Sequence, residues 1–301
     1  MTTLPRKLTA GDQVRVVAPS SSLALLPDAV RLAAVGRLES EFGVRVTFGE
    51  HVHESGPLGV GPVAGRVADL HDAFADPDVA GIMTVDGGHA NQLLPHLDYD
   101  LIRANPKVLV GFSDALQGAL VARANLVTYS GPRFSTFGRD AEATVAAFRS
   151  AVFSDEAVSW VPSPGNQGWW VLQPGTANGP IVGGTLSSVN LLQGTPYWPD
   201  LDGAVVVVAE DSVHDFAGGL TSLLQTGIVV RGLVVGRFPR RTEIPQELLR
   251  HIVTTAPQLA GVPVLANVDV GPTDPVYTFP VGGSCYLAAE PGAVEIVLTR
   301  H

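Results

Sequence analysis

The chain of 301 residues has one cysteine, few aromatic residues and no long apolar run. Cys285 has no partner for an intramolecular disulfide or a thiolate metal site, which excludes disulfide-stapled and cysteine-rich zinc folds. We expect this thiol to be buried as inert packing. No apolar stretch reaches the roughly 18 to 20 residues that a membrane span requires. The first residues, Met-Thr-Thr-Leu-Pro-Arg-Lys, form no signal-peptide core. We therefore expect a soluble cytoplasmic protein with no membrane partner.

Runs of basic residues are also missing. The 29 acidic residues outnumber the 19 basic ones and give a formal charge of −10. Because binding to a phosphate backbone needs a basic surface, nucleic acid is not an expected partner.

The sequence indicates neither a cofactor nor a metal. Gly59-Val-Gly-Pro-Val-Ala64 fits the loose dinucleotide pattern. It follows a loop rather than the first strand, and the acidic residue expected about 20 positions later has no clear match. His51 and His53 alternate along an extended segment, but no third metal ligand is evident. We predict no cofactor and no metal site.

What is present is an alternation of short apolar strands and amphipathic helices, dense in glycine (33) and proline (23). This pattern predicts an α/β protein with a parallel sheet. Near residues 154–168 the sequence becomes rich in Ser, Pro, Gly and Asn. We therefore predict an N-terminal α/β domain with a parallel sheet at 1–155, a linker at 156–170 and a more β-rich α/β domain at 171–301.

The first candidate for catalysis is Ser113. Residues 107–114, Lys-Val-Leu-Val-Gly-Phe-Ser-Asp, lead from an apolar strand into a Gly-x-Ser-Asp corner. A residue at the carboxyl end of a strand in an open parallel sheet faces the crevice where such folds bind ligands. The structural alternative is that the serine only caps the following helix.

Two further strand ends carry polar groups. Asp86-Gly87-Gly88-His89 follows the expected strand Gly81–Val85 and offers a backbone N–H to an acyl oxygen, or simply a tight turn. Glu210 ends the apolar run Ala204–Ala209, where a carboxylate needs a partner. It either orients a histidine or faces water.

Candidate bases and ligand-binding aromatics are less well defined. His89 adjoins the glycine pair and His214 lies four residues after Glu210, so each is a possible proton acceptor for Ser113. Trp169 and Trp170 are expected either to line a substrate groove or to pack in the core or a domain interface.

Ordered motifs along nearly the whole chain resemble the LD-carboxypeptidase family of serine peptidases, particularly the branch that contains the microcin C immunity protein. The matching segments include Leu-Thr-Ala-Gly-Asp at 8–12, Gly-Gly-His-Ala-Asn-Gln at 87–92, Gly-Phe-Ser-Asp at 111–114, Ser-Gly-Pro-Arg-Phe at 130–134, Gly-Gly-Thr-Leu at 183–186 and Gly-Pro-Thr-Asp-Pro at 271–275.

The resemblance implies a Rossmann-like N-terminal domain joined to a more β-rich C-terminal domain, often dimeric, with the active site in the cleft between them. It implies that Ser113 is the nucleophile, that Glu210 orients a base, and that the backbone N–H groups of Gly88 and Asp114 form the oxyanion hole. The implied substrates are peptides or peptide-like amides cut near a free carboxyl end. The implied catalytic histidine has no counterpart here, because its position is Pro272.

Proline has neither a titratable group nor a backbone N–H, so the family's route to hydrolysis lacks its base. Three hypotheses remain. The protein is a hydrolase with a relocated base, His89 or His214, and weak or altered activity. Alternatively, it is a biosynthetic enzyme that uses Glu210 for non-hydrolytic acid/base chemistry such as cyclisation or rearrangement. The third hypothesis is a non-catalytic binder of a peptide-like ligand.

Overall fold

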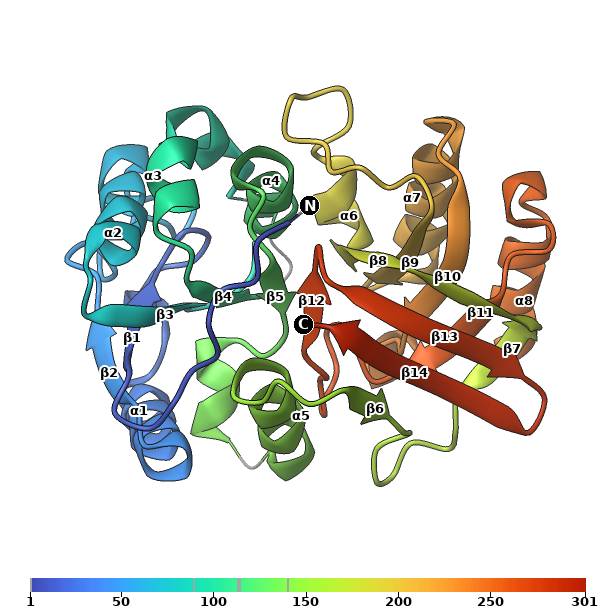
Figure 1. Cartoon of the computed structure of the whole chain (residues 1–301), viewed down its shortest axis with the longest axis horizontal. Helices are drawn as coiled ribbons and strands as arrows, with labels where there is room; N and C mark the ends of the chain where they lie inside the picture. The colour runs from blue at the N-terminus through green and yellow to red at the C-terminus, as the bar shows by residue number, and fades with distance from the viewer. Residues whose placement is uncertain (1, 89, 113–114, 140) are drawn as a thin grey trace.

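The computed structural model describes residues 2–88, 90–112, 115–139 and 141–301. In this part of the chain the strands form a six-stranded and an eight-stranded sheet, which lie next to each other with helices around them (Figure 1). The prediction of a Rossmann-like α/β half followed by a more β-rich half is confirmed.

The first sheet has the strand order β12-β5-β4-β3-β1-β2. Its strands β1 to β5 are parallel, and β12 runs antiparallel to β5. The central strands β3 and β4 are buried along their whole length, as expected for apolar strands covered on both faces. The strands are β1 Gln13–Val17, β2 Arg45–Phe48, β3 Val79–Thr84, β4 Val108–Gly111, β5 Thr128–Ser130 and β12 Phe279–Val281.

Helices cover both faces of this sheet (Figure 1). On one face Phe42 of α1, Phe137 of η3 and Phe148 of α5 make edge-to-face ring contacts at 5.1–6.1 Å. On the other face α2, α3 and α4 bury a second apolar cluster. The helices are α1 Asp28–Phe42, α2 Val63–Ala75, α3 Tyr99–Ala104, α4 Ala115–Ala124 and α5 Glu142–Val152, with 3-10 turns η1 Leu23–Leu25, η2 Asn91–His96 and η3 Phe134–Gly138.

The second sheet has the strand order β6-β14-β13-β8-β9-β10-β11-β7. Strands β8 to β11 are parallel, and the flanking strands are antiparallel. The strands are β6 Val158–Trp160, β7 Trp170–Gln173, β8 Gly175–Thr185, β9 Ala204–Ala209, β10 Val230–Gly236, β11 Val264–Val268, β13 Ser284–Glu290 and β14 Ala293–Arg300. The helices are α6 Leu186–Asn190, α7 Val213–Gln225 and α8 Gln246–Thr254, with 3-10 turns η4 Arg240–Thr242 and η5 Pro257–Leu259.

The chain crosses between the sheets late in the sequence. Strand β12, Phe279–Val281, pairs with β5 of the first sheet. Strand β6 pairs with β14 of the second sheet. Each half therefore contributes to the junction, and the division at 1–155, 156–170 and 171–301 stays a prediction.

Candidate active site

Strand ends from both sheets meet around one small cavity. Phe112 follows β4 directly, Ala209 ends β9, and Gly271 lies in the loop between β11 and β12. The cavity has a volume of about 10 Å³, close to the space that one water molecule occupies. Its lining consists of Phe112, Ser130, Gly184, Thr185, Val207, Val208, Ala209, Val270, Gly271 and Phe279. The fold thus brings together residues that are far apart in the sequence.

Glu210 lies directly beside this cavity at the end of β9. Its side chain is buried, and its carboxylate accepts two backbone hydrogen bonds. Oε2 accepts from the N–H of Ser187 at 2.9 Å, and Oε1 accepts from the N–H of Asp211 at 3.1 Å. These donors offset the cost of desolvating the carboxylate and fix its orientation.

The loop that contains Pro272 packs against the same strand end. Gly271 has a φ of +98°, and a Cβ atom there would lie only 2.3 Å from the Cβ of Ala209. Only glycine permits both this backbone conformation and this close approach. Pro272, the position to which the family resemblance assigns a histidine, therefore directly follows a residue that packs against Ala209, the neighbour of Glu210.

The turn that follows β3 also leaves little room for a side chain. A Cβ at Gly88 would lie 3.1 Å from both the Cβ and the carbonyl oxygen of Ser20. Two residues earlier, Asp86 Oδ1 accepts a hydrogen bond from the Gly87 N–H at 2.7 Å. Glycine at 88 therefore allows this turn to lie against the segment that follows β1.

Arg133 connects the strand ends of the first sheet. It lies after β5, and its guanidinium carbon lies 4.2 Å from the ring centroid of Phe112. Its Nε forms a 3.0 Å ion pair with Asp86 Oδ1. In the sequence, Arg133 stands out only as part of the motif Ser-Gly-Pro-Arg-Phe at 130–134. The local feature that could have indicated a role for Arg133 is its position as a cation shortly after β5, a strand of the parallel sheet.

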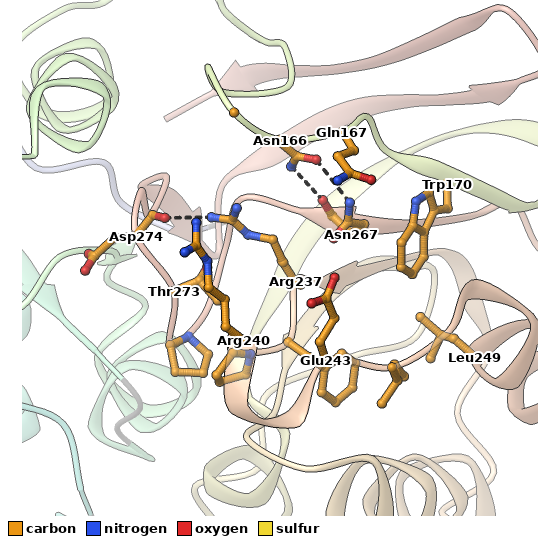
Figure 2. A pocket seen from close by; sticks show the side chains of 16 residues that line it. Asn166, Gln167, Trp170, Arg237, Arg240, Glu243, Leu249, Asn267, Thr273 and Asp274 are labelled. Atoms are coloured by element: carbon orange, nitrogen blue, oxygen red, sulfur yellow. Dashed lines mark hydrogen bonds between the residues drawn. The ribbon is translucent and has the colours of Figure 1, made fainter.

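A larger cavity of about 620 Å³ opens beside Pro272, at the carboxyl ends of β10 and β11. Figure 2 shows Arg237 and Arg240 on the side of Asp274, and Trp170 with Leu249 at the opposite end. Glu243 projects between these two ends. The cavity thus has charged side chains at the end near Pro272 and an apolar, aromatic end farther away.

A buried carboxylate holds two walls of the larger cavity together. Asp269 is fully buried, and it accepts hydrogen bonds from Ser163 Oγ at 2.7 Å, Asn166 Nδ2 at 3.0 Å and Trp169 Nε1 at 3.2 Å. It also pairs with Arg237 at 3.4 Å, which donates to the carbonyl oxygen of residue 274 at 2.9 Å. Nothing local in the sequence marks Asp269, because its partners lie about 30 to 106 residues away.

The two tryptophans occupy different environments. Trp170 lines the larger cavity. Trp169 is buried, donates to Asp269, and is not among the described residues that line that cavity. The paired sequence Trp-Trp alternates along an extended segment, so its two side chains point in opposite directions.

Three of the residues singled out from the sequence, His89, Ser113 and Asp114, lie outside the described residues. His214 is exposed in the first turn of α7, and the part of the chain that is described offers it no hydrogen bond or ion pair. Its role as a base stays a prediction, as do the roles of the other site residues.

The thiol of Cys285 is buried and shows no sign of reactivity. Burial raises the pKa of the Cys285 thiol to about 12, so this cysteine is held in its unreactive protonated form.

The described residues contain no group of three or more His, Cys, Asp or Glu side chains arranged to hold a metal ion. Among the helices that are described, none has the length and apolarity needed to cross a membrane.

Comparison with known proteins gives consistent matches. The LD-carboxypeptidase N-terminal domain matches residues 14–131, and the LD-carboxypeptidase C-terminal domain matches residues 178–287. The putative carboxypeptidase YocD of Bacillus subtilis is 36% identical over 98% of this chain and 99% of its own.

Solved structures agree with these matches. An MccF-like protein from Bacillus anthracis superposes with a TM-score of 0.96 and 37% identity, covering 99% of this chain and 100% of its own. The microcin C7 self-immunity protein MccF of Escherichia coli, in complex with aspartyl sulfamoyl adenosine, shares the fold with a TM-score of 0.88 at 22% identity over 99% of both chains. The chain belongs to the LD-carboxypeptidase family.

Proposed function

We propose that this protein is a serine hydrolase that cleaves a peptide or peptide-like amide near a free carboxyl end. The observation that carries this proposal is the small cavity lined by Phe112, Ala209 and Gly271. These residues directly precede Ser113, Glu210 and Pro272 in the chain. Membership of a peptidase family gives independent support.

In the proposed reaction the hydroxyl oxygen of Ser113 attacks the acyl carbon, and its proton passes to a base that then protonates the departing nitrogen. Water hydrolyses the resulting ester and regenerates the serine. We assign stabilisation of the oxyanion to the backbone N–H groups of Gly88 and Asp114. Glycine at 88 suits this role because its backbone is not shielded by a side chain.

The base is the altered component. Pro272 accepts no proton, so we assign this role to His89 or His214, and we expect turnover well below that of a complete triad. Removing one triad member leaves about 10³ to 10⁴ of rate enhancement over water, from the oxyanion hole and substrate binding. Glu210 keeps its two backbone donors and orients the polar groups around it.

We assign the larger cavity to the part of the substrate beyond the cleaved bond. Its volume of about 620 Å³ is in the range of small-molecule sites. Trp170 offers an aromatic face, and Trp169 supports the wall through Asp269. MccF binds aspartyl sulfamoyl adenosine, a peptide-like ligand of comparable chemistry to the proposed substrates.

A second candidate is binding without turnover. The observation that favours it is Pro272, which removes a proton acceptor while the two cavities beside it persist. In this case the protein would sequester a peptide-like molecule.

The experiment that separates these candidates incubates the protein with D-amino-acid-terminated peptides and aminoacyl sulfamates, and follows products by mass spectrometry. Hydrolysis that disappears in Ser113→Ala supports the hydrolase. Binding measured by calorimetry, without any product, supports sequestration and overturns the hydrolase. A product of unchanged mass overturns both and indicates the biosynthetic alternative.

We further infer a cytoplasmic homodimer. The dimer is implied by the family resemblance, and a single buried cysteine is typical of proteins from reducing compartments. Light scattering of the purified protein tests the dimer, and a monomer at micromolar concentration would contradict it.

A further inference from the structure

Arg133 is held in a fixed orientation by two contacts. Its guanidinium stacks on Phe112 at 4.2 Å, and its Nε pairs with Asp86 at 3.0 Å. Stacking and ion pairing together restrict a side chain that is otherwise flexible. The side chain is still 32% exposed, so solvent or a ligand reaches it.

These two contacts place Arg133 beside the proposed site. Phe112 lines the small cavity and directly precedes Ser113. Asp86 holds the Gly87 N–H, one residue before the proposed oxyanion donor Gly88. The guanidinium therefore lies between the strand end of the nucleophile and the strand end of the oxyanion turn.

The ion pair to Asp86 uses only Nε. Within the described residues, Nη1 and Nη2 of Arg133 have no hydrogen-bond or ion-pair partner. These two nitrogens form the edge of the guanidinium that matches a carboxylate with two parallel N–H···O bonds. Asp86 and Phe112 thus orient the group and leave a two-donor edge available.

We propose that Arg133 recognises the terminal carboxylate of the substrate. This inference rests on the proposed function, since it names the residue that reads the free carboxyl end. Arg133 is a binding residue in this account and takes no part in proton transfer. Its charge selects substrates that end in a carboxylate over otherwise identical substrates that end in an amide.

The test measures binding by calorimetry in the full-length protein carrying Ser113→Ala, which prevents turnover. The probes are acetyl-Lys-D-Ala and its C-terminal amide. We expect the free acid to bind on the order of tenfold or more tightly than the amide, because bonds between charged groups are stronger than neutral ones. Adding Arg133→Gln should remove this preference and leave affinity for the amide unchanged within about twofold.

Arg123→Gln is the matched control. Arg123 also lies over an aromatic ring, with 5.9 Å to the centroid of Tyr99, but it is in the last turn of α4, before the amino end of β5, whereas Arg133 follows the carboxyl end of that strand. The Arg123→Gln substitution removes the same charge and should keep the preference for the free acid. Arg133→Lys should retain a reduced preference, because it keeps the charge but loses the two-donor edge.

The inference is overturned if Arg133→Gln weakens acid and amide equally, which would indicate a purely structural role, or if the preference persists in that variant. Binding of neither peptide also overturns it. In that case, labelling of wild-type Ser113 by a fluorophosphonate shows whether the proposed hydrolase falls as well: an adduct retains it, and no adduct removes both.

Discussion

The two walls of the candidate site contribute different parts of the proposed serine hydrolase. The wall from the first sheet has the Gly-Phe-Ser-Asp sequence, the tight turn at Gly88, and Arg133 stacked on Phe112. The wall from the second sheet holds Glu210, whose carboxylate accepts two backbone hydrogen bonds. It also includes the loop that contains Pro272. In the proposed hydrolase both walls keep their backbone contacts, and the histidine that the resemblance assigns to the second wall is absent, because that position is Pro272.

This difference has a physical basis. Gly271 is restricted to glycine by a contact with Ala209, so the loop keeps its course whatever follows it. We propose that the side chain at the next position, 272, affects the chemistry of the site more than the fold. A substitution in the second wall should therefore either raise amide hydrolysis or lower the free energy of unfolding. The following variants separate these two effects.

The largest expected effect comes from Pro272→His. An imidazole placed after Gly271 would supply the missing base, and we expect amide hydrolysis to rise at least tenfold, since a triad base contributes several orders of magnitude. Product formation measured by mass spectrometry checks this. Pro272→Asn is the control, because its side chain is similar in size and cannot act as a base. Equal activity of two folded variants would show that more than the base is missing.

The frame itself is tested by Gly271→Ala. Both the positive φ and the 2.3 Å contact with Ala209 oppose a side chain, and we expect a loss of about 3 kcal/mol in the free energy of unfolding. Gly168→Ala is the matched control, with a φ of +109° but nothing within 4 Å, and should cost only about 1–2 kcal/mol. Denaturant unfolding measures both. Equal losses would contradict the role of the close contact.

A smaller effect is expected from Glu210→Gln. The amide has one acceptor oxygen, so either Ser187 or Asp211 loses the partner of its backbone N–H. A partly buried N–H left without a partner costs at most about 3 kcal/mol, which should appear as reduced stability in denaturant unfolding. Unchanged stability would show that these hydrogen bonds do not anchor the carboxylate. Glu247→Gln, an exposed change in α8, serves as the reference.

A pH-dependent effect is expected at the junction of the two halves. Lys7 donates to the carbonyl oxygen of Ala151 at 2.5 Å and lies 2.7 Å from Nδ1 of His301. Burial lowers the pKa of Lys7 to about 8, although Asp155 opposes this shift. Between pH 8 and about 10.4, the pKa of a free lysine, the unfolded chain binds more protons than the folded protein.

The contribution of Lys7 to stability should therefore rise with pH across that window. Thermal unfolding of wild type and Lys7→Met, compared from pH 7 to 10, checks this, because other titrating groups cancel in the difference. A difference that stays constant or changes in the opposite direction would contradict a buried Lys7 with a lowered pKa.

Local sequence patterns were sufficient for much of the fold. The run Ala204–Ala209 forms β9 with the predicted bounds, because a continuous apolar stretch suits a strand buried on both faces. Helix α5, Glu142–Val152, was not predicted, and its N-terminal end has no side-chain cap to signal it. Strand β13 has no β-branched residue, and pairing with β8 and β14 on its two sides stabilises it.

The candidate site divides in the same way. Glu210 and the glycine turn at Gly88 follow recognisable strands, so their positions were predictable from the sequence. Arg133 and Asp269 acquire their roles from partners distant in the chain, such as Asp86 and Ser163. Long-range contacts of this kind leave no local pattern.

The most direct test of the central claim is the reactivity of Ser113. We predict that incubating the wild-type protein with a fluorophosphonate, followed by peptide mass spectrometry, yields an adduct on Ser113 and not on other serines, and that Pro272→His accelerates its formation. A folded wild-type protein that shows no adduct at Ser113 would contradict the account.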